Sequence, residues 1–145
     1  MADFALDPRI EASSRLVAEL GLCQVRLQDD ARFPWLVLIP RRAGAVELFD
    51  LSREDQITLL AEGELASQAV RALGEAEGRA VEKLNIANLG NVVAQLHVHV
   101  IGRRSDDPHW PGPVWGQGGT LAHDEKAWRA RLNIVRAVLR MGLLS

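Results

Sequence analysis

The chain has 145 residues, of which 48% are hydrophobic and 25% are charged, as is typical of one globular domain with a sizeable core. The formal net charge of −2 excludes a general attraction to nucleic acid or to an acidic membrane. The single cysteine, Cys23, excludes an intramolecular disulfide and fits a reducing compartment. The longest apolar run, Trp35 to Ile39, is too short to span a bilayer, and no signal-peptide pattern precedes it. We therefore expect a cytoplasmic protein that binds neither membranes nor nucleic acids.

The first part of the chain predicts one helix and two strands. Asp7-Pro8 is typical of a helix N-cap followed by proline at the first helical position, and Gly21 is a candidate end of this helix. Residues 23–28 then alternate between apolar and polar, as a half-buried strand does. A turn at residues 29–32 leads to residues 35–39, whose apolar character predicts a central strand covered on both faces. The buried stripe expected for the helix comprises Ile10, Leu16, Val17 and Leu20.

The middle of the chain predicts a long amphipathic helix that packs on the sheet. Ser52, with Asp55 three residues later, resembles a capping box at its start. Gly74 and Gly78 are candidate ends. The apolar residues that recur at helical spacing between these points are Ile57, Leu60, Ala61, Leu65, Ala69, Ala72 and Leu73.

Two strands, an irregular loop and a last helix complete the prediction. Residues 83–87 and 92–103 have strand patterns and are joined by a turn at Leu89-Gly90-Asn91. Residues 105–119 are too rich in Pro, Gly and Trp for a regular element, and Asp124 can cap a helix over residues 124–142. Because short turns join the strands, we expect an antiparallel β-sheet flanked by helices, of the α+β class, in one domain over residues 1–145.

The chemistry lies in residues 95–101. Side chains alternate across a strand, so Gln95, His97 and His99 share one face at intervals of about 7 Å, while the apolar residues between them face the other way. On spacing alone this row is an ordinary solvent-facing surface, half of a metal site, or a catalytic site. A metal site would need His109 or His123 as a further ligand. No carboxylate or cysteine stands at a helpful spacing, which weakens the metal interpretation.

The pattern resembles the histidine triad (HIT) family, in which three histidines alternate with apolar residues on one strand. Gln95 takes the first place of the triad here, His97 the second and His99 the third. The resemblance extends from about Cys23 to Trp110, within a domain core of residues 22–110. Three flanking motifs are also similar to the family: Trp35 to Arg42, an apolar strand ending in Ile-Pro and two basic residues; Asn88-Leu89-Gly90, a turn before the triad strand; and His109-Trp110-Pro111, found in the phosphoramidase branch.

This resemblance implies a fold, a substrate class and a set of site residues. The fold is an antiparallel sheet with helices, commonly paired into a homodimer. The substrates are nucleoside phosphate derivatives such as dinucleoside polyphosphates, phosphoramidates and acyl nucleotides. His97 would attack the α-phosphate and hold the nucleotide covalently until water releases it, with no cofactor and no metal site beyond Mg²⁺ carried by the substrate. The other implied site residues are His99 and Gln95 in catalysis, and Asn88, Asn91, Asp30, His109 and Trp110 in substrate binding.

Elementary chemistry agrees with this assignment. The ordinary pKa of histidine, about 6.5, leaves much of an imidazole neutral and nucleophilic at pH 7. The second nitrogen of a nucleophilic ring needs an acceptor, for which the family uses a main-chain carbonyl, and His99 can donate to a phosphate oxygen. Gln95 departs from the family pattern, because an amide cannot exchange a proton as histidine does. We therefore expect a preference for leaving groups that need no general acid.

Two other functions stay open on the sequence. The chain could bind nucleotides as a sensor without turnover, since it lacks the first histidine, or it could bind a metal through His97, His99 and His109. For several other residues a role in the fold competes with a role in function. These are Trp35 and Trp128, which we assign to the core; Trp110 and Trp115, which either anchor the loop or close over the substrate; His123, which flanks a helix; and Arg103-Arg104, which either end a strand in solvent or attract phosphate.

Overall fold

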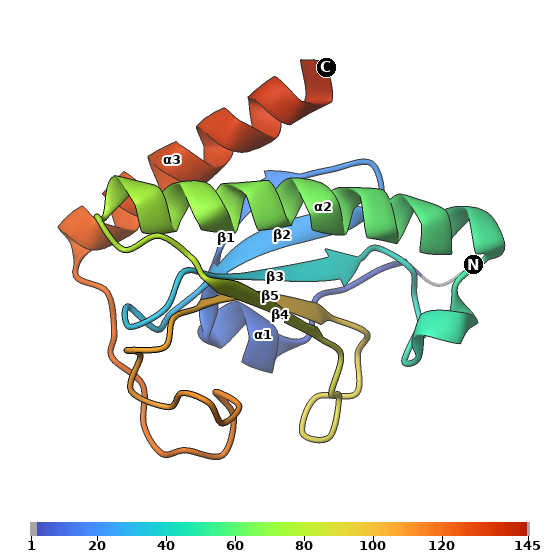
Figure 1. Cartoon of the computed structure of the whole chain (residues 1–145). Coiled ribbons are helices and arrows are strands. Elements are labelled where there is room, and N and C mark those ends of the chain that lie inside the picture. The colour runs from blue at the N-terminus through green and yellow to red at the C-terminus, as the bar shows by residue number, and fades with distance from the viewer. Residues whose placement is uncertain (1–2, 145) are drawn as a thin grey trace.

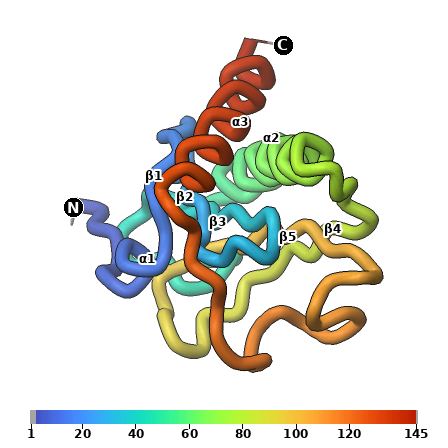
Figure 2. The backbone as a smooth tube through the Cα atoms, turned by 90° about the vertical axis from the view of Figure 1, so that its left-hand side faces the viewer, coloured from blue at the N-terminus to red at the C-terminus, as the bar shows by residue number. Residues whose placement is uncertain are grey.

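The computed structural model describes residues 3–144 and contains a five-stranded antiparallel sheet in the order β1-β2-β3-β5-β4. Helices α2 and α3 cover one face of this sheet, and α1 and the long loops lie on the other (Figures 1 and 2). This is the α+β fold that the sequence predicts. The elements are α1 (Pro8–Ala12), β1 (Ser14–Glu19), β2 (Cys23–Gln28), β3 (Trp35–Pro40), the 3₁₀ helix η1 (Leu48–Asp50), α2 (Arg53–Ala76), β4 (Lys83–Ala87), β5 (Val98–Arg103) and α3 (Glu125–Leu144).

Strand β3 is the centre of the sheet, and every one of its residues is buried. Leu36 and Leu38 belong to the hydrophobic cluster under α2 and α3. Trp35, Val37 and Ile39 belong to a second cluster on the opposite face. The prediction of a strand covered on both faces is therefore confirmed, and β3 separates a helix-covered face from a loop-covered one.

The first predicted helix is wrong beyond Ala12. Helix α1 ends there because the amide of Ser13 and the hydroxyls of Ser13 and Ser14 all bond to the carbonyl of Ile10, and such local bonds compete with a continuing helix. Residues 14–19 instead form the edge strand β1, which pairs with β2. The spacing of Leu16 and Val17 suits a helix and a strand equally, and pairing with β2 decides between them.

Helix α2 begins as predicted, with the Ser52 hydroxyl accepting a hydrogen bond from the amide of Asp55. It ends just before Gly78, which has a φ of 70°, whereas Gly74 lies inside the helix. The predicted stripe is wrong in the first half of the helix, where Ile57 and Leu60 are 64% and 78% exposed. The residues actually buried include Leu59, Ala66, Val70 and Leu73. An apolar surface therefore stays uncovered at this end of α2.

The predicted strand over residues 92–103 starts only at Val98. The register that places Leu38 opposite Val98 would place Pro40 opposite Leu96. Proline has no N–H to donate to a ladder, so pairing stops at this point. Leu96 instead donates its N–H to the carbonyl of Ala45. The consequence is that Gln95 and His97 stand on a short irregular segment directly before β5.

The last helix forms as predicted. The Asp124 carboxylate accepts a hydrogen bond from the amide of Ala127 at its start, and Trp128, Val135 and Leu139 are buried. Among residues 3–144, no helix is long and apolar enough to cross a membrane.

Candidate active site

Two histidines stand side by side on the loop-covered face of the sheet. The rings of His97 and His99 have centroids 4.9 Å apart and an interplanar angle of 74°. Both residues are only 8% exposed. They alternate with Val98, which lies on the opposite face and belongs to the cluster under α2. The structure thus excludes an ordinary solvated surface, because these imidazoles are held in a largely buried pair.

The hydrogen bonding of His97 defines which of its nitrogens can react. Its Nδ1 atom lies 2.6 Å from the main-chain carbonyl oxygen of Gln95. A carbonyl can only accept, so the proton of the neutral ring is on Nδ1 and the lone pair is on Nε2. The same carbonyl can stabilise the positive charge that the ring acquires when Nε2 forms a bond. His97 therefore has the orientation that a nucleophilic histidine needs.

His99 has the opposite tautomer. The indole Nε1–H of Trp35 donates to Nδ1 of His99 at 3.0 Å. Since Nδ1 accepts, Nε2 carries the proton of the neutral ring. Burial lowers the pKa of His99 to about 3, and the nearby charge of His97 adds to this effect. His99 is therefore neutral near pH 7 and carries an N–H donor on a ring that lies next to that of His97.

Trp35, which the sequence assigns only to the core, contacts the candidate site directly. It is buried in the core, but its indole N–H also sets the tautomer of His99. Trp115, from the loop after β5, completes the surroundings of His99. Its ring makes edge contacts with His99 at 5.1 Å and with Trp35 at 6.2 Å. The one signal in the sequence for this contact was an indole, that of Trp35, on a predicted strand that can pair with the predicted strand of the triad.

The side chain of Gln95 points into a different environment from the two histidines. Its Oε1 accepts a hydrogen bond from the amide of Asp7, and its Nε2 donates to the carbonyl of Ala5, both at 2.8 Å. Both polar atoms are thus bound to the N-terminal segment. A direct part of Gln95 in catalysis stays a prediction, and its amide has one N–H left to offer a substrate.

Three predicted substrate-binding residues occupy separate positions. Asn88 follows β4, and its buried Oδ1 atom has no hydrogen-bond partner among residues 3–144. Asn91 is exposed in the turn. Asp30 is fully buried, forms an ion pair with Arg32 at 2.8 Å, and accepts the amide of Leu121. The proposed ribose contact of Asp30 stays a prediction, and it would require the Arg32 ion pair to open.

His109 and Trp110 lie around the far end of β5. His109 stacks on Phe33 with ring centroids 6.0 Å apart, and its Nε2 lies 3.2 Å from the guanidinium of Arg32. Trp110 packs over the guanidinium of Arg103 at 5.7 Å. Arg103 is four residues beyond His99, about 13 Å along the strand. The structure thus groups these two residues with Phe33 and the arginines, while their predicted contact with substrate stays a prediction.

The remaining polar candidates have roles in the fold. Arg103 is 1% exposed, pairs with Asp107 at 2.8 Å, and also bonds to Asn85 and to the carbonyl of Gly112, so it is neither a solvated strand end nor a free cation. His123 is buried, with Nδ1 3.0 Å from an Asp29 oxygen and Nε2 3.0 Å from the Arg131 guanidinium. Within the described part of the chain, no group of three or more His, Cys, Asp or Glu side chains could hold a metal ion.

Two adjacent, largely buried histidines on a five-stranded α+β sheet are the arrangement expected of a histidine triad protein. The chain matches the HIT domain over residues 9–106, and it belongs to this family. No curated protein matches it.

Solved structures of three bacterial proteins share both fold and sequence with the chain. A histidine triad protein from Sinorhizobium meliloti is 46% identical, with a TM-score of 0.85 over 94% of this chain and 97% of that one. One from Bradyrhizobium japonicum is 40% identical, with a TM-score of 0.87 over 95% and 99%. One from Marinobacter aquaeolei is 36% identical, with a TM-score of 0.88 over 97% and 98%. The similarity thus covers nearly the full length of each protein.

Proposed function

We propose that the protein is a nucleotidyl hydrolase or transferase that acts through a covalent nucleotide on His97. The single observation that carries this proposal is the bond between Nδ1 of His97 and the Gln95 carbonyl, because it directs an unprotonated Nε2 away from the strand. Burial lowers the pKa of the neighbouring His99, so its ring is neutral and can supply an N–H donor without adding a second positive charge to the site. A pair of histidines with opposite tautomers fits nucleophilic attack on phosphorus.

The first step transfers the nucleotide to the protein. Nε2 of His97 forms a bond to the α-phosphorus, and the bond from phosphorus to the leaving group breaks with its electron pair. The proton on Nδ1 stays with the ring and is held by the Gln95 carbonyl, so that the positive charge is stabilised. The N–H of His99 donates to a non-bridging phosphate oxygen as negative charge develops there.

The second step releases the nucleotide. A water molecule, or another acceptor in a transferase, attacks the phosphorus of the nucleotidyl-histidine. The bond between phosphorus and Nε2 breaks, its electron pair returns to the ring, and the proton of the water passes to solvent. His97 is then neutral again, with its Nδ1 proton in place, and the cycle is complete.

The substrate class follows from the lack of a titratable first triad residue. The amide of Gln95 cannot protonate a departing amine, and general acid catalysis is worth about 10²–10⁴-fold where a leaving group needs it. We propose nucleoside phosphate derivatives with good leaving groups, such as pyrophosphate-type groups or the carboxylate of an acyl nucleotide. Mg²⁺ can accompany the polyphosphate of the substrate.

A panel of adenylated substrates with leaving groups of graded pKa tests this function. We expect turnover that falls steeply as the leaving-group pKa rises. Equilibrium titration of adenosine monophosphate, run beside the panel, separates an enzyme from a sensor. Tight binding with no turnover of any substrate in the panel would contradict the proposal and favour a nucleotide-binding protein without catalysis.

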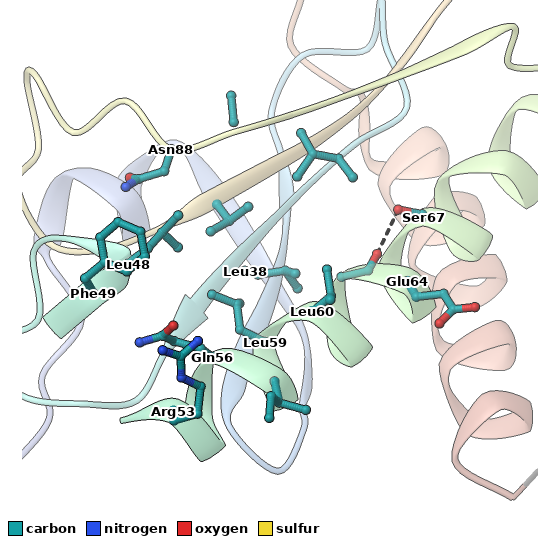
Figure 3. Close-up of a pocket in the computed structure, with 15 residues that line it drawn as sticks. Leu38, Leu48, Phe49, Arg53, Gln56, Leu59, Leu60, Glu64, Ser67 and Asn88 are labelled. Atoms are coloured by element: carbon teal, nitrogen blue, oxygen red, sulfur yellow. Dashed lines mark hydrogen bonds between the residues drawn. The ribbon is translucent and has the colours of Figure 1, made fainter. Parts of the chain in front are cut away.

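We also propose that the protein is a homodimer, formed over an apolar groove on the face opposite His97. The groove has a volume of ≈ 630 Å³ and lies between η1, the first half of α2 and the sheet (Figure 3). Phe49 and Leu60 are 85% and 78% exposed there. In the described residues β4 pairs only with β5, so its outer edge can pair with another strand. A second copy related by two-fold symmetry would cover both features at once.

Light scattering of Leu60→Lys tests the dimer. A lysine in the groove would leave a charge unpaired in the interface, so we expect a dimer for the unchanged protein and a monomer for the variant. Ala130→Lys, on an exposed position of α3, is the matched control and stays dimeric. A monomer for the unchanged protein at micromolar concentration would refute this proposal.

A further inference from the structure

The amide of Gln95 binds the N-terminal segment as a neighbouring strand would. Its two hydrogen bonds go to the carbonyl of Ala5 and the amide of Asp7, which flank Leu6. In an extended chain these two main-chain groups point to the same side. A primary amide presents an acceptor and a donor side by side, so one glutamine side chain satisfies both.

The segment has further attachments beside the triad. Arg9 forms an ion pair with Asp7 at 3.0 Å and donates to the carbonyl of Val92 at 3.0 Å, in the loop that leads to His97. Phe4 and Leu6 pack on the apolar cluster of the loop-covered face. Residues 4–9 are therefore held both to the sheet and to the chain that carries the nucleophile.

Gln95 connects this segment directly to His97. Its main-chain carbonyl accepts from Nδ1 of His97, and its side chain binds Ala5 and Asp7. The hydrogen bonds from Arg9 lower the pKa of the Asp7 carboxyl, and the charge of His97 contributes a smaller lowering. The carboxylate of the segment thus lies within electrostatic reach of the nucleophile.

Histidine could not replace glutamine in this contact. The two nitrogens of an imidazole point away from each other, and a protonated ring has no acceptor at all. Glutamine at the first place of the triad therefore has a structural role, which is to bind Ala5 and Asp7, and this role does not involve proton transfer.

We propose that Gln95 is a positioning residue, which fastens residues 5–9 against the triad strand and acts on the reaction through this segment without exchanging a proton with the substrate. The kinetic consequence rests on the proposed function, and the structural one does not. When the segment is released, the loop that leads to His97 loses its bond from Arg9 to the Val92 carbonyl, so we expect the substrate site to be less ordered and KM to rise. The main-chain carbonyl of residue 95 still accepts from Nδ1 of His97, so the nucleophile is retained and the pH profile of kcat is expected to keep its form.

A double-mutant cycle between Gln95→Ala and Asp7→Pro tests the proposal. Asp7 has a φ of −60°, which proline adopts, so the substitution removes the N–H without forcing the backbone. Asp7→Ala is the matched control for loss of the carboxylate. We expect KM to be about tenfold higher for Gln95→Ala than for the unchanged protein, and about tenfold higher for Asp7→Pro than for Asp7→Ala. In the Gln95→Ala background, Asp7→Pro is expected to be no worse than Asp7→Ala, because the amide that it removes has already lost its partner.

Amide hydrogen exchange over residues 4–12 gives a readout that needs no turnover. Gln95→Ala and Asp7→Pro are expected to lose protection in this segment, whereas His97→Ala keeps it. Gln95→Glu provides a variant of the same size that keeps the acceptor and loses the donor, and it is expected to lose protection as well.

Two results would overturn the proposal. If the effects of Gln95→Ala and Asp7→Pro on KM multiply, Gln95 acts on the substrate directly. If Gln95→Ala leaves the exchange of the segment unchanged, the amide does not hold it. Failure of the proposed function would look different, since exchange would respond as expected while no substrate was turned over.

Discussion

The two ends of the loop-covered face both contain buried basic side chains, but these side chains differ in how many of their polar atoms are bound to the protein. At one end His97 and His99 each have one nitrogen bound to the protein and one with no hydrogen-bond partner among residues 3–144. At the other end Arg103 donates to Asp107, Asn85 and Gly112, so its guanidinium is occupied by the protein. Residue type alone does not separate a reactive site from a structural cluster; the difference lies in which polar atoms stay available.

The largest expected effect is at the reactive end. His97→Ala removes the nucleophile, so turnover is expected to fall by about 10⁴-fold or more, while the circular dichroism spectrum stays unchanged. Steady-state assay with the best substrate of the panel measures this. Arg129→Ala, at an exposed position of α3, is the control. If His97→Ala kept most of its activity, the end of the face that contains His97 would not be the reactive one, and the contrast with the Arg103 end would fail.

At the other end the largest effect is expected on stability. Arg103→Met removes the charged partner of the buried Asp107 carboxylate, which keeps the amides of Arg104 and His109 as donors; such a loss typically costs about 3–5 kcal/mol. Arg103 and Asp107 are 1% and 5% exposed, whereas the neighbouring Arg104 pairs with the half-exposed Asp106. Arg104→Met is therefore the matched control, with an expected loss of about 1 kcal/mol or less. Urea unfolding measures both, and an unchanged midpoint for Arg103→Met would show that this end is not structural.

Trp35→Phe tests how the protein maintains the tautomer of His99. The substitution keeps an aromatic ring in the core but removes the N–H that binds Nδ1 of His99. We expect kcat to fall by up to about 10²-fold, because the donor to the phosphate is no longer fixed. Trp128→Phe, in the cluster under α2 and α3, controls for the loss of an indole. Equal kcat values for the two variants would contradict the role of Trp35.

The low pKa of His99 predicts a pH dependence of stability. Its pKa is about 3 in the folded protein and about 6.5 when unfolded, so between these values the unfolded chain binds the additional proton. The stability contributed by the neutral ring is therefore complete above pH 6.5 and is lost as the pH falls toward 3. The loss approaches about 1.4 kcal/mol per pH unit.

Urea unfolding of the unchanged protein and of His99→Asn between pH 7 and pH 4 measures this smaller effect. The variant lacks the titrating ring, so its stability is expected to fall less steeply with acidification. Parallel curves would mean that the pKa of His99 is the same in the folded and unfolded protein, which would contradict the lowering by burial.

The same contrast explains how much could be predicted from the sequence. Alternation along one strand was enough to place His97 and His99 on one face, and the apolar run of residues 35–39 was enough to predict a central strand. These signals are local. Strand β1 was missed because the spacing of Leu16 and Val17 suits a helix as well, and the late start of β5 depends on Pro40 in another strand.

Except for the bond between His97 and the Gln95 carbonyl, the contacts that define the site are long-range and have no local pattern. The amide of Gln95 binds residues 88 and 90 positions earlier in the chain, and Trp35 binds His99 across 64 positions. The ion pairs of Asp30 and Arg103 could not be read from composition either, because they depend on burial. Sequence thus predicted which residues could react, and packing determined which of their atoms are available.

The most direct test of the central claim is to trap the nucleotide on the protein. A short reaction with an adenylated substrate is stopped in alkaline detergent, which preserves phosphorus–nitrogen bonds, and peptides are analysed by mass spectrometry. The account predicts adenylate on His97, none on His99, and none in His97→Ala. Rapid turnover with adenylate on another residue, or undiminished in His97→Ala, would contradict it.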